Sequence, residues 1–321
     1  MRLIFAGSSS FGIPSLQRLM QRDDALLVLS QPDKAAGRHL HLQPCPVAEF
    51  ARGNGLELFQ PQDPNSPQSL DRIRSFAPDL IVTASYGALL KRELRNIPAL
   101  GAVNLHPSLL PKYRGATPIQ SALLNGDAST GMTIFRLQAR LDAGPVLAQE
   151  SLAVADNDNF QTLHDKLAEL GSWMLAELLP KLQAGTANES AQDDALATYT
   201  AKLDKQDTIL DWSQPARKVL NKIRALSPNP GAQTYFRAFP FKILAARLTD
   251  IPASGDPGSF ANLTRNAGFS VNCRDFQLGI QTLQPSGKKA MAAQAFLLGA
   301  RLGPADRFTN HNQNNNQREE Q

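Results

Sequence analysis

Cysteine and long apolar runs are scarce or missing in this chain of 321 residues. The two cysteines, Cys45 and Cys273, lie far apart and outside any metal-ligand spacing, which indicates free thiols of a reducing compartment. No run reaches 18 apolar residues, so no membrane span is expected. The first apolar stretch, residues 3–6, is too short for a signal peptide. With 42% apolar and 19% charged residues, the composition favours a soluble, cytoplasmic enzyme.

A glycine motif for dinucleotides is also missing. Residues 7–12 read GSSSFG, which lacks the Gly-x-Gly-x-x-Gly pattern of dinucleotide-binding proteins. This segment could still hold an anion with backbone amides at a helix start. The plainer interpretation is an ordinary connection between a strand and a helix.

The first half of the chain alternates between strand-like and helix-like apolar patterns. Strands are expected at residues 3–6, 25–30, 79–84, 101–105 and 131–137. Helices are expected at residues 11–21, 47–54, 70–76, 118–124 and 160–179, the last one ended by Pro180. This alternation predicts an α/β domain with a doubly wound, mostly parallel sheet of the Rossmann-like kind.

The second half has a different pattern. Residues 183–208 are rich in Ala, Gln, Asn and Asp, which indicates a linker. Short strands separated by turns follow at residues 233–236, 241–247, 268–273 and 276–283, as in a small β-barrel or sandwich. We therefore expect a catalytic domain at 1–182, a linker at 183–208, a β domain at 209–308 and a disordered, Asn- and Gln-rich tail at 309–321.

Positive charge is concentrated in the second half. Residues 200–310 contain 15 Lys or Arg and 7 Asp or Glu, a net charge of +8, whereas residues 1–199 have a net charge of −3. A basic C-terminal region beside a slightly acidic N-terminal one indicates that a polyanion binds the former. The alternative is a solvated basic surface without a partner.

An amide and an imidazole lie two residues apart at the end of an expected strand. Asn104 and His106 follow the apolar run 101–103, and residues i and i+2 of a strand point to the same face. The carboxyl ends of strands are where open α/β sheets bind their ligands. Asn can donate a hydrogen bond to a developing oxyanion, and His can move a proton near neutral pH. Taken alone, the pair could equally be a strand end with a hydrogen-bonded histidine.

The run that follows this pair is more specific. Residues 108–115, SLLPKYRG, resemble the signature of the folate-dependent formyltransferases, and RLDAGPV at residues 140–146 agrees. In that family an Asn, a His and an Asp are catalytic, and the resemblance places them at Asn104, His106 and Asp142. A carboxylate beside an imidazole would orient the ring and favour its charged form. Without the resemblance, Asp142 would be an ordinary turn aspartate before Gly144.

The second half is similar, segment by segment, to the methionyl-tRNA formyltransferase family. The matching runs are YTAKL at 199–203, ILDWS at 209–213, IRALSPNPGA at 223–232, LQPSGKKAM at 283–291 and FLLGAR at 296–301, so that the resemblance covers roughly residues 1–303. It implies transfer of a formyl group from 10-formyltetrahydrofolate to the α-amine of methionyl initiator tRNA, for translation initiation, without a metal. It also implies an oligonucleotide-binding-type barrel that binds tRNA. The residues it implies for folate binding are Ser108, Leu109, Leu110 and Pro111, with backbone at 84–87 and 138–141 around the pterin.

The connection at residues 31–44 is too long for an ordinary link between a strand and a helix. In the resembled tRNA enzymes a mobile loop here packs against the acceptor stem, which implies that Arg38 binds tRNA. His39 and His41 stand where the family has other residues, often basic, so the charge of the loop at neutral pH is open. Two histidines could also suggest a metal, but no third ligand is near in sequence.

Two rival functions belong to other classes. A sugar-nucleotide formyltransferase would share the first domain, and a catalytically idle RNA-binding relative would share the fold. The run ATPI at residues 116–119 and the GKKAM run at 287–291 favour the tRNA enzyme. The presence of all three residues Asn104, His106 and Asp142 argues against an idle relative. We expect the protein to act as a monomer.

Overall fold

The computed structural model describes residues 1–36, 41–264, 268–303 and 305–310. The chain forms two compact units: unit 1 contains residues 1–118, 129–153 and 164–200, and unit 2 contains residues 119–128, 154–163 and 201–321. Residues 183–208, expected as a linker, divide between the units after Thr200. Most of the expected tail, residues 311–321, lies outside the described residues. Within the described ranges, no helix is both long and apolar enough to cross a bilayer.

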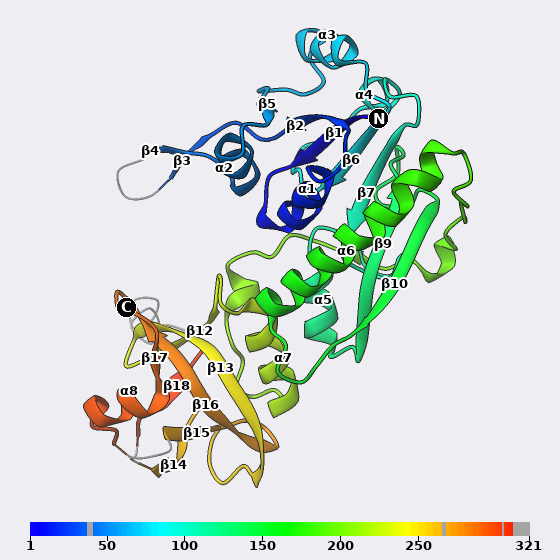
Figure 1. The fold of residues 1–321 in the computed structure, drawn as a ribbon. Coiled ribbons are helices and arrows are strands. Elements are labelled where there is room, and N and C mark those ends of the chain that lie inside the picture. Colours follow the sequence, from blue (N-terminus) through cyan, green and yellow to red (C-terminus); the bar gives the residue numbers. More distant parts are fainter. Residues whose placement is uncertain (37–40, 265–267, 304, 311–321) are drawn as a thin grey trace, which may run out of the picture. The chain divides into compact units, whose positions relative to one another are not determined.

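Unit 1 is built on a seven-stranded sheet (Figure 1). Its central strands are apolar and buried on both faces, as parallel strands covered by helices must be. The order across the sheet is β10 (Val146–Ala153), β9 (Ser129–Arg136), β7 (Ala102–His106), β6 (Leu80–Ala84), β1 (Arg2–Gly7), β2 (Ala25–Leu29) and β5 (Glu57–Phe59). The five strands from β7 to β5 are parallel, and β9 and β10 are antiparallel at one edge. The predicted doubly wound, mostly parallel sheet is confirmed.

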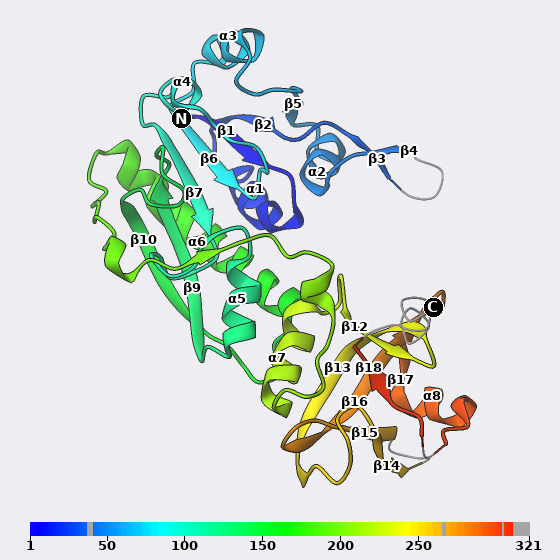
Figure 2. The ribbon, with the colours of Figure 1, turned by 180° about the vertical axis from the view of Figure 1, so that it is seen from behind.

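Helices cover both faces of this sheet. The helix α6 lies along β9 and β10 in both ribbon views, and its Gly171 is close to the side chains of Leu105 and Met132 (Figures 1 and 2). Because side chains alternate along a strand, Asn104 and His106 point to the face opposite Leu105. The helices of unit 1 are α1 (Ile13–Leu19), α2 (Pro46–Gly53), α3 (Pro67–Phe76), α4 (Arg92–Arg95) and most of α6 (Phe160–Gln183). The helix α5 (Pro118–Asn125) falls almost wholly in unit 2.

The helix α6 does not end at Pro180, as the sequence predicted, but continues to Gln183 with Pro180 inside it. A proline inside a helix removes one hydrogen bond and typically costs about 3 kcal/mol. Leu178, Leu179 and Leu182 are all buried around this position. The burial of these three side chains offsets the cost, so packing rather than local preference determines where the helix ends.

Two short strand pairs were not predicted. The long connection at residues 31–44 contains a hairpin of β3 (Lys34–Ala36) and β4 (His41–Gln43), formed by backbone pairing where side chains have little to pack against. Its tip, with Arg38 and His39, lies outside the described residues. The second pair joins β8 (Arg114–Gly115) to β11 (Tyr199–Thr200) in parallel. It brings together Arg114 and Tyr199, which are 85 residues apart in the sequence.

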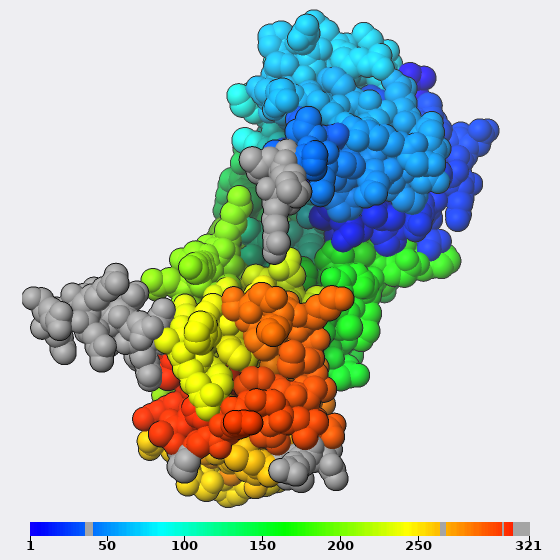
Figure 3. Space-filling view, turned by 90° about the vertical axis from the view of Figure 1, so that its left-hand side faces the viewer, coloured from blue at the N-terminus to red at the C-terminus, as the bar shows by residue number. Residues whose placement is uncertain are grey.

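Unit 2 contains a curled antiparallel sheet packed against α7 (Ala216–Leu226). Register shifts along the long strand β13 bend and twist it. The core holds a stack of Trp212 on Phe308 and a cluster of further phenylalanines around Phe236. The yellow and orange strands of this sheet lie side by side on the face shown in Figure 3.

The elements of this sheet match the predicted small β domain. They are β12 (Ala232–Phe236), β13 (Phe239–Pro252), β14 (Phe260–Thr264), β15 (Gly268–Asn272), β16 (Phe276–Pro285), β17 (Met291–Ala292) and β18 (Phe308–Thr309), with α8 (Ala293–Ala300) beside β15 and β16. The prediction of a small antiparallel β domain after the α/β domain is confirmed.

Candidate active site

Asn104 and His106 lie on one face of β7, close to its carboxyl end. Thr83 is paired with Asn104 in the register of β6 and β7, and its Oγ1 donates a hydrogen bond to Asn104 Oδ1 over 2.7 Å. The same hydroxyl lies 3.1 Å from the carbonyl oxygen of Val103, and the shorter contact, to Asn104 Oδ1, favours the orientation in which Nδ2 is the free donor. Asn104 Nδ2 donates to no group within the described part of the chain, and therefore remains available to a ligand oxygen.

The imidazole of His106 is buried, with 4% of the residue exposed. Its Nε2 lies 2.8 Å from the carbonyl oxygen of Tyr113, so Nε2 carries the proton and donates to that oxygen. Its Nδ1 faces Asp142 Oδ2 at 3.8 Å, too far for a direct hydrogen bond. The nitrogen that can accept a proton in the neutral ring is therefore Nδ1.

Burial lowers the pKa of His106 from its ordinary value, because the charged ring loses its hydration. Asp142 and the Tyr113 carbonyl act in the opposite direction and offset part of this effect. Asp142 thus favours the charged ring, as the sequence predicted, but burial is the larger effect. His106 is consequently a neutral base at pH 7.

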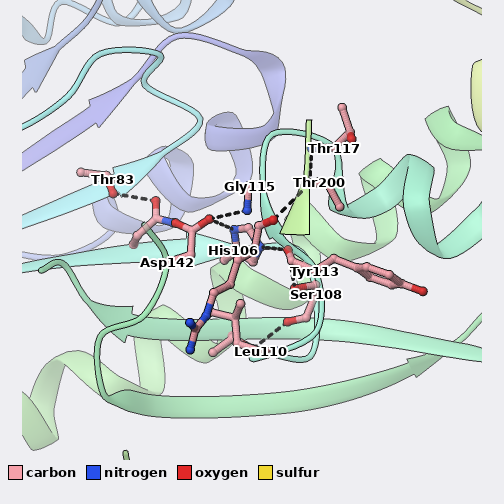
Figure 4. A network of polar contacts seen from close by, with 12 residues as sticks. Thr83, His106, Ser108, Leu110, Tyr113, Gly115, Thr117, Asp142 and Thr200 are labelled. Carbon is pink, nitrogen blue, oxygen red and sulfur yellow. Dashed lines mark hydrogen bonds and ion pairs between the residues drawn. The ribbon is translucent and has the colours of Figure 1, made fainter. Parts of the chain in front are cut away.

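Asp142 lies in the connection between β9 and β10, and its carboxylate faces the imidazole of His106. Asp142 Oδ2 accepts a hydrogen bond of 2.8 Å from the backbone N–H of Gly115 (Figure 4). The backbone of Asp142 has φ +48°, a left-handed conformation that is uncommon outside glycine but tolerated by Asp. The three residues predicted to be catalytic are therefore brought together, from β7 and from a loop 36 residues further along the chain.

The segment Ser108–Pro111 is fixed by polar side chains from the next two strands. Thr133 Oγ1 on β9 donates to the Ser108 carbonyl over 2.6 Å and accepts from the Leu110 N–H over 3.2 Å. Gln149 Nε2 on β10 donates to the Leu110 carbonyl over 2.9 Å. Ser108 and Leu110 are buried, whereas Leu109 and Pro111 are half-buried. Any ligand contact from this segment falls to its backbone and to Leu109 and Pro111.

A cavity of about 450 Å³ opens at the carboxyl ends of β1, β2 and β6. It is lined by the serine-rich turn 8–10, by residues 85–87, and by Gln31, Lys34 and Pro46. Sequence resemblance had placed residues 84–87 around the pterin. Asn104 and His106 are not among its lining residues.

Some site residues were missed by the sequence analysis. Thr83 is a lone hydroxyl in an otherwise apolar strand, which was an available signal. The Tyr113 carbonyl carries no sequence signal. Arg38, predicted to bind tRNA, lies outside the described residues. Among the residues that the structure does describe, no cluster of His, Cys, Asp or Glu could hold a metal ion.

Two family models match consecutive parts of the chain. The formyl transferase model matches residues 1–179, and the model of the formyl transferase C-terminal domain matches residues 202–301. The fold and the site thus define a formyltransferase, an enzyme that moves a one-carbon group.

Curated relatives give the particular family. The chain is 40% identical over 309 residues to the methionyl-tRNA formyltransferase of Methylococcus capsulatus, which covers 94% of this chain and 100% of that protein. It is also 40% identical over 307 residues to the methionyl-tRNA formyltransferase of Moorella thermoacetica, covering 95% and 98%. The chain belongs to the methionyl-tRNA formyltransferase family.

Solved structures share the fold at much lower identity. HypX from Aquifex aeolicus, in complex with tetrahydrofolic acid, has a TM-score of 0.65 and 17% identity, and the match covers 94% of this chain and 48% of that one. The sugar 3N-formyl transferase WlaRD has a TM-score of 0.64 and 16% identity, covering 90% and 99%.

Proposed function

We propose that this protein transfers the formyl group of 10-formyltetrahydrofolate to the α-amine of methionyl initiator tRNA, with Asn104, His106 and Asp142 as its catalytic residues. The observation that carries the proposal is the same-face pair on β7: an amide whose donor end is available, beside a buried imidazole with a carboxylate 3.8 Å from Nδ1. We further expect the protein to work as a monomer in the cytoplasm.

The chemistry follows from these groups. The neutral amine attacks the formyl carbon, a C–N bond forms, and negative charge develops on the formyl oxygen. Asn104 Nδ2 donates to this oxygen, and one such donor typically contributes about 3 kcal/mol to catalysis. His106 Nδ1 takes the proton released by the attacking nitrogen. Asp142 stabilises the imidazolium that results.

The second half of the reaction returns the proton. The tetrahedral intermediate collapses as the bond between the formyl carbon and N10 breaks. His106 delivers its proton to N10, so tetrahydrofolate leaves with a neutral amine and His106 is again neutral. One base therefore serves both half-reactions, and no metal or redox partner is needed to balance them.

Substrate binding is assigned to three regions. The segment Ser108–Pro111 holds the folate through its backbone and through Leu109 and Pro111, because its other side chains are buried. The basic region 200–310 binds the tRNA backbone by charge. Arg38 contacts the acceptor end.

The test is turnover with charged initiator tRNA and 10-formyltetrahydrofolate. His106→Ala and Asn104→Ala should each lower kcat by about a hundredfold or more, while folate binding is retained. Asn157→Ala is the matched control, because Asn157 is exposed and belongs to unit 2, whereas the proposed site belongs to unit 1. Near-normal turnover in either site variant would refute the assignment, and a preference for an amino-sugar nucleotide in a substrate panel would refute the substrate.

A further inference from the structure

The segment that follows α6 passes directly behind the loop that carries Asp142. Tyr199 and Thr200 form β11, which pairs with Arg114 and Gly115 of β8. Figure 4 shows Thr200 beside Gly115, the residue whose N–H holds the Asp142 carboxylate. Residues 190–200 therefore contribute to unit 1 and to the surroundings of its site, although sequence composition assigned them to a linker.

In this segment, both the nitrogen and the oxygen of the Gln192 side-chain amide form hydrogen bonds. Its Nε2 donates to the carbonyl oxygens of Asp142 and of Gly144, each over 2.8 Å. Its Oε1 accepts from Arg114 Nε over 3.1 Å and from Arg114 Nη2 over 2.8 Å. One amide thus connects the backbone of the catalytic loop to an arginine that is fully buried.

The arginine is itself anchored. Arg114 forms an ion pair of 2.9 Å with Asp194 and a hydrogen bond of 3.1 Å with the Tyr199 hydroxyl. Both partners come from the segment 190–200, as Gln192 does. Removing Gln192 would therefore leave Arg114 with charged and polar partners, but would leave the two loop carbonyls without this donor.

The loop that carries Asp142 has little freedom to adopt another conformation if the Gln192 hydrogen bonds are lost. Asp142 is in the left-handed conformation, and a Cβ added at Gly144 would lie 1.7 Å from the carbonyl oxygen of Arg136. The loop thus approaches the end of β9 as closely as backbone allows. Gln192 bonds the carbonyls on both sides of this close approach.

We propose that Gln192 is a positioning residue of formyl transfer: it holds the backbone of Asp142 so that the carboxylate faces Nδ1 of His106. The inference rests on the proposed function of His106 and Asp142. Gln192 acts through the loop, because its side-chain amide is already bonded to the carbonyl oxygens of Asp142 and Gly144 and to Arg114.

The test is Gln192→Met, which keeps the length of the side chain and removes both donors. We expect kcat to fall by about tenfold or more, because displacements of about 1 Å at a catalytic group have effects of this size or larger. The KM values for folate and for tRNA should change by less than about twofold, since the amide that is removed bonds the loop and Arg114 rather than a ligand. Gln192→Glu is the second variant, for use if Gln192→Met folds poorly. It keeps an acceptor for Arg114 but has no donor for the two loop carbonyls, so kcat should fall by a similar factor.

A pH profile separates positioning from a loss of folded enzyme. The groups facing His106 are the Asp142 carboxylate and the Tyr113 carbonyl, and both raise its pKa. A displaced Asp142 raises it less, so the acid limb of kcat should move to lower pH in Gln192→Met. A structural role alone would lower kcat equally at every pH. Gln183→Met, on the exposed end of α6, is the control and should leave both kcat and its limb unchanged.

A double-mutant cycle decides the outcome. In an Asp142→Ala background, Gln192→Met should have little further effect, because the group that it positions is gone. Full additivity of the two losses, or normal kcat in both Gln192 variants, would overturn the inference. If instead Asp142→Ala alone left kcat normal, the proposed function of Asp142 would fail, and the two failures are thereby distinguished.

Discussion

Replacing Thr83 with Val tests how much the orientation of Asn104 matters to catalysis. Thr83 is buried, and its Oγ1 donates to Asn104 Oδ1 over 2.7 Å. Valine has nearly the same shape as threonine, so the main change is loss of this donor. Without it, the amide of Asn104 can rotate and present its oxygen, rather than its nitrogen, to the formyl group.

The size of the effect follows from the contact that is lost. A buried neutral hydrogen bond contributes about 1 kcal/mol net, which is about fivefold in the preference of the amide for its productive orientation. We therefore expect Thr83→Val to lower kcat by about three- to tenfold. Asn104→Ala removes the donor altogether and should cost about a hundredfold or more.

The assay is steady-state formylation of charged initiator tRNA, with thermal unfolding measured on the same samples. Thr83→Ser retains the hydroxyl and should recover most of the activity. Thr130→Val, at a buried threonine of β9, is the matched control for the loss of a hydroxyl from the sheet. A loss in Thr83→Val as large as that of Asn104→Ala, or an equal loss in Thr83→Ser, would refute the reasoning.

Three further predictions concern pH, backbone geometry and charge. Because burial lowers the pKa of His106, the acid limb of kcat/KM should lie below the ordinary histidine value of about 6.5. The free energy of unfolding, measured with urea, should also fall as the pH drops below about 6.5, because there the unfolded chain binds a proton on His106 that the folded chain does not. The part of this slope between about pH 5 and 6.5, above the range in which carboxylates titrate, should be reduced in His106→Gln, and an acid limb above pH 7 would contradict the burial argument. Gly115→Ala should destabilise the protein by about 3 kcal/mol in calorimetry, because φ at this residue is +114° and the new Cβ would lie 2.3 Å from the carbonyl oxygen of Thr200. Gly53→Ala, which has open space around it, is the control and should be nearly neutral. Replacing the exposed Lys288 and Lys289 by Ala should weaken tRNA binding and flatten its salt dependence, and an unchanged slope would show that these lysines do not face phosphates.

The sequence predicted those features that depend on neighbours along the chain. Strands β1, β6 and β7 follow from their apolar runs, and the same-face placement of Asn104 and His106 follows from the two-residue period of a strand. The end of α6 could not be predicted locally, because the burial of leucines around Pro180 depends on the folded sheet.

Partners that are distant in sequence escaped prediction for a related reason. Thr83 and Asn104 meet only because β6 and β7 adopt one particular register. Gln192 lies in a polar, alanine-rich stretch that looks like a linker by composition, yet its amide is saturated by groups 48 to 78 residues away. Asn104, His106 and Asp142 were singled out from the sequence, and only the structure supplies the groups that hold them.

The pairing of β8 with β11 has a consequence for the time at which the enzyme becomes active during its synthesis. Arg114 must wait for Tyr199, 85 residues later in the chain. At about 5–20 residues per second, a ribosome needs roughly 4 to 17 seconds to make that stretch. Throughout this interval the nascent chain carries Asn104 and His106 and, for most of it, Asp142. It still lacks β11, the strand that pairs with β8 beside the loop of Asp142. The proposed catalytic arrangement is thus completed only after the polypeptide has passed residue 200, and a nascent chain released earlier should carry Asn104, His106 and Asp142 without formyl-transfer activity.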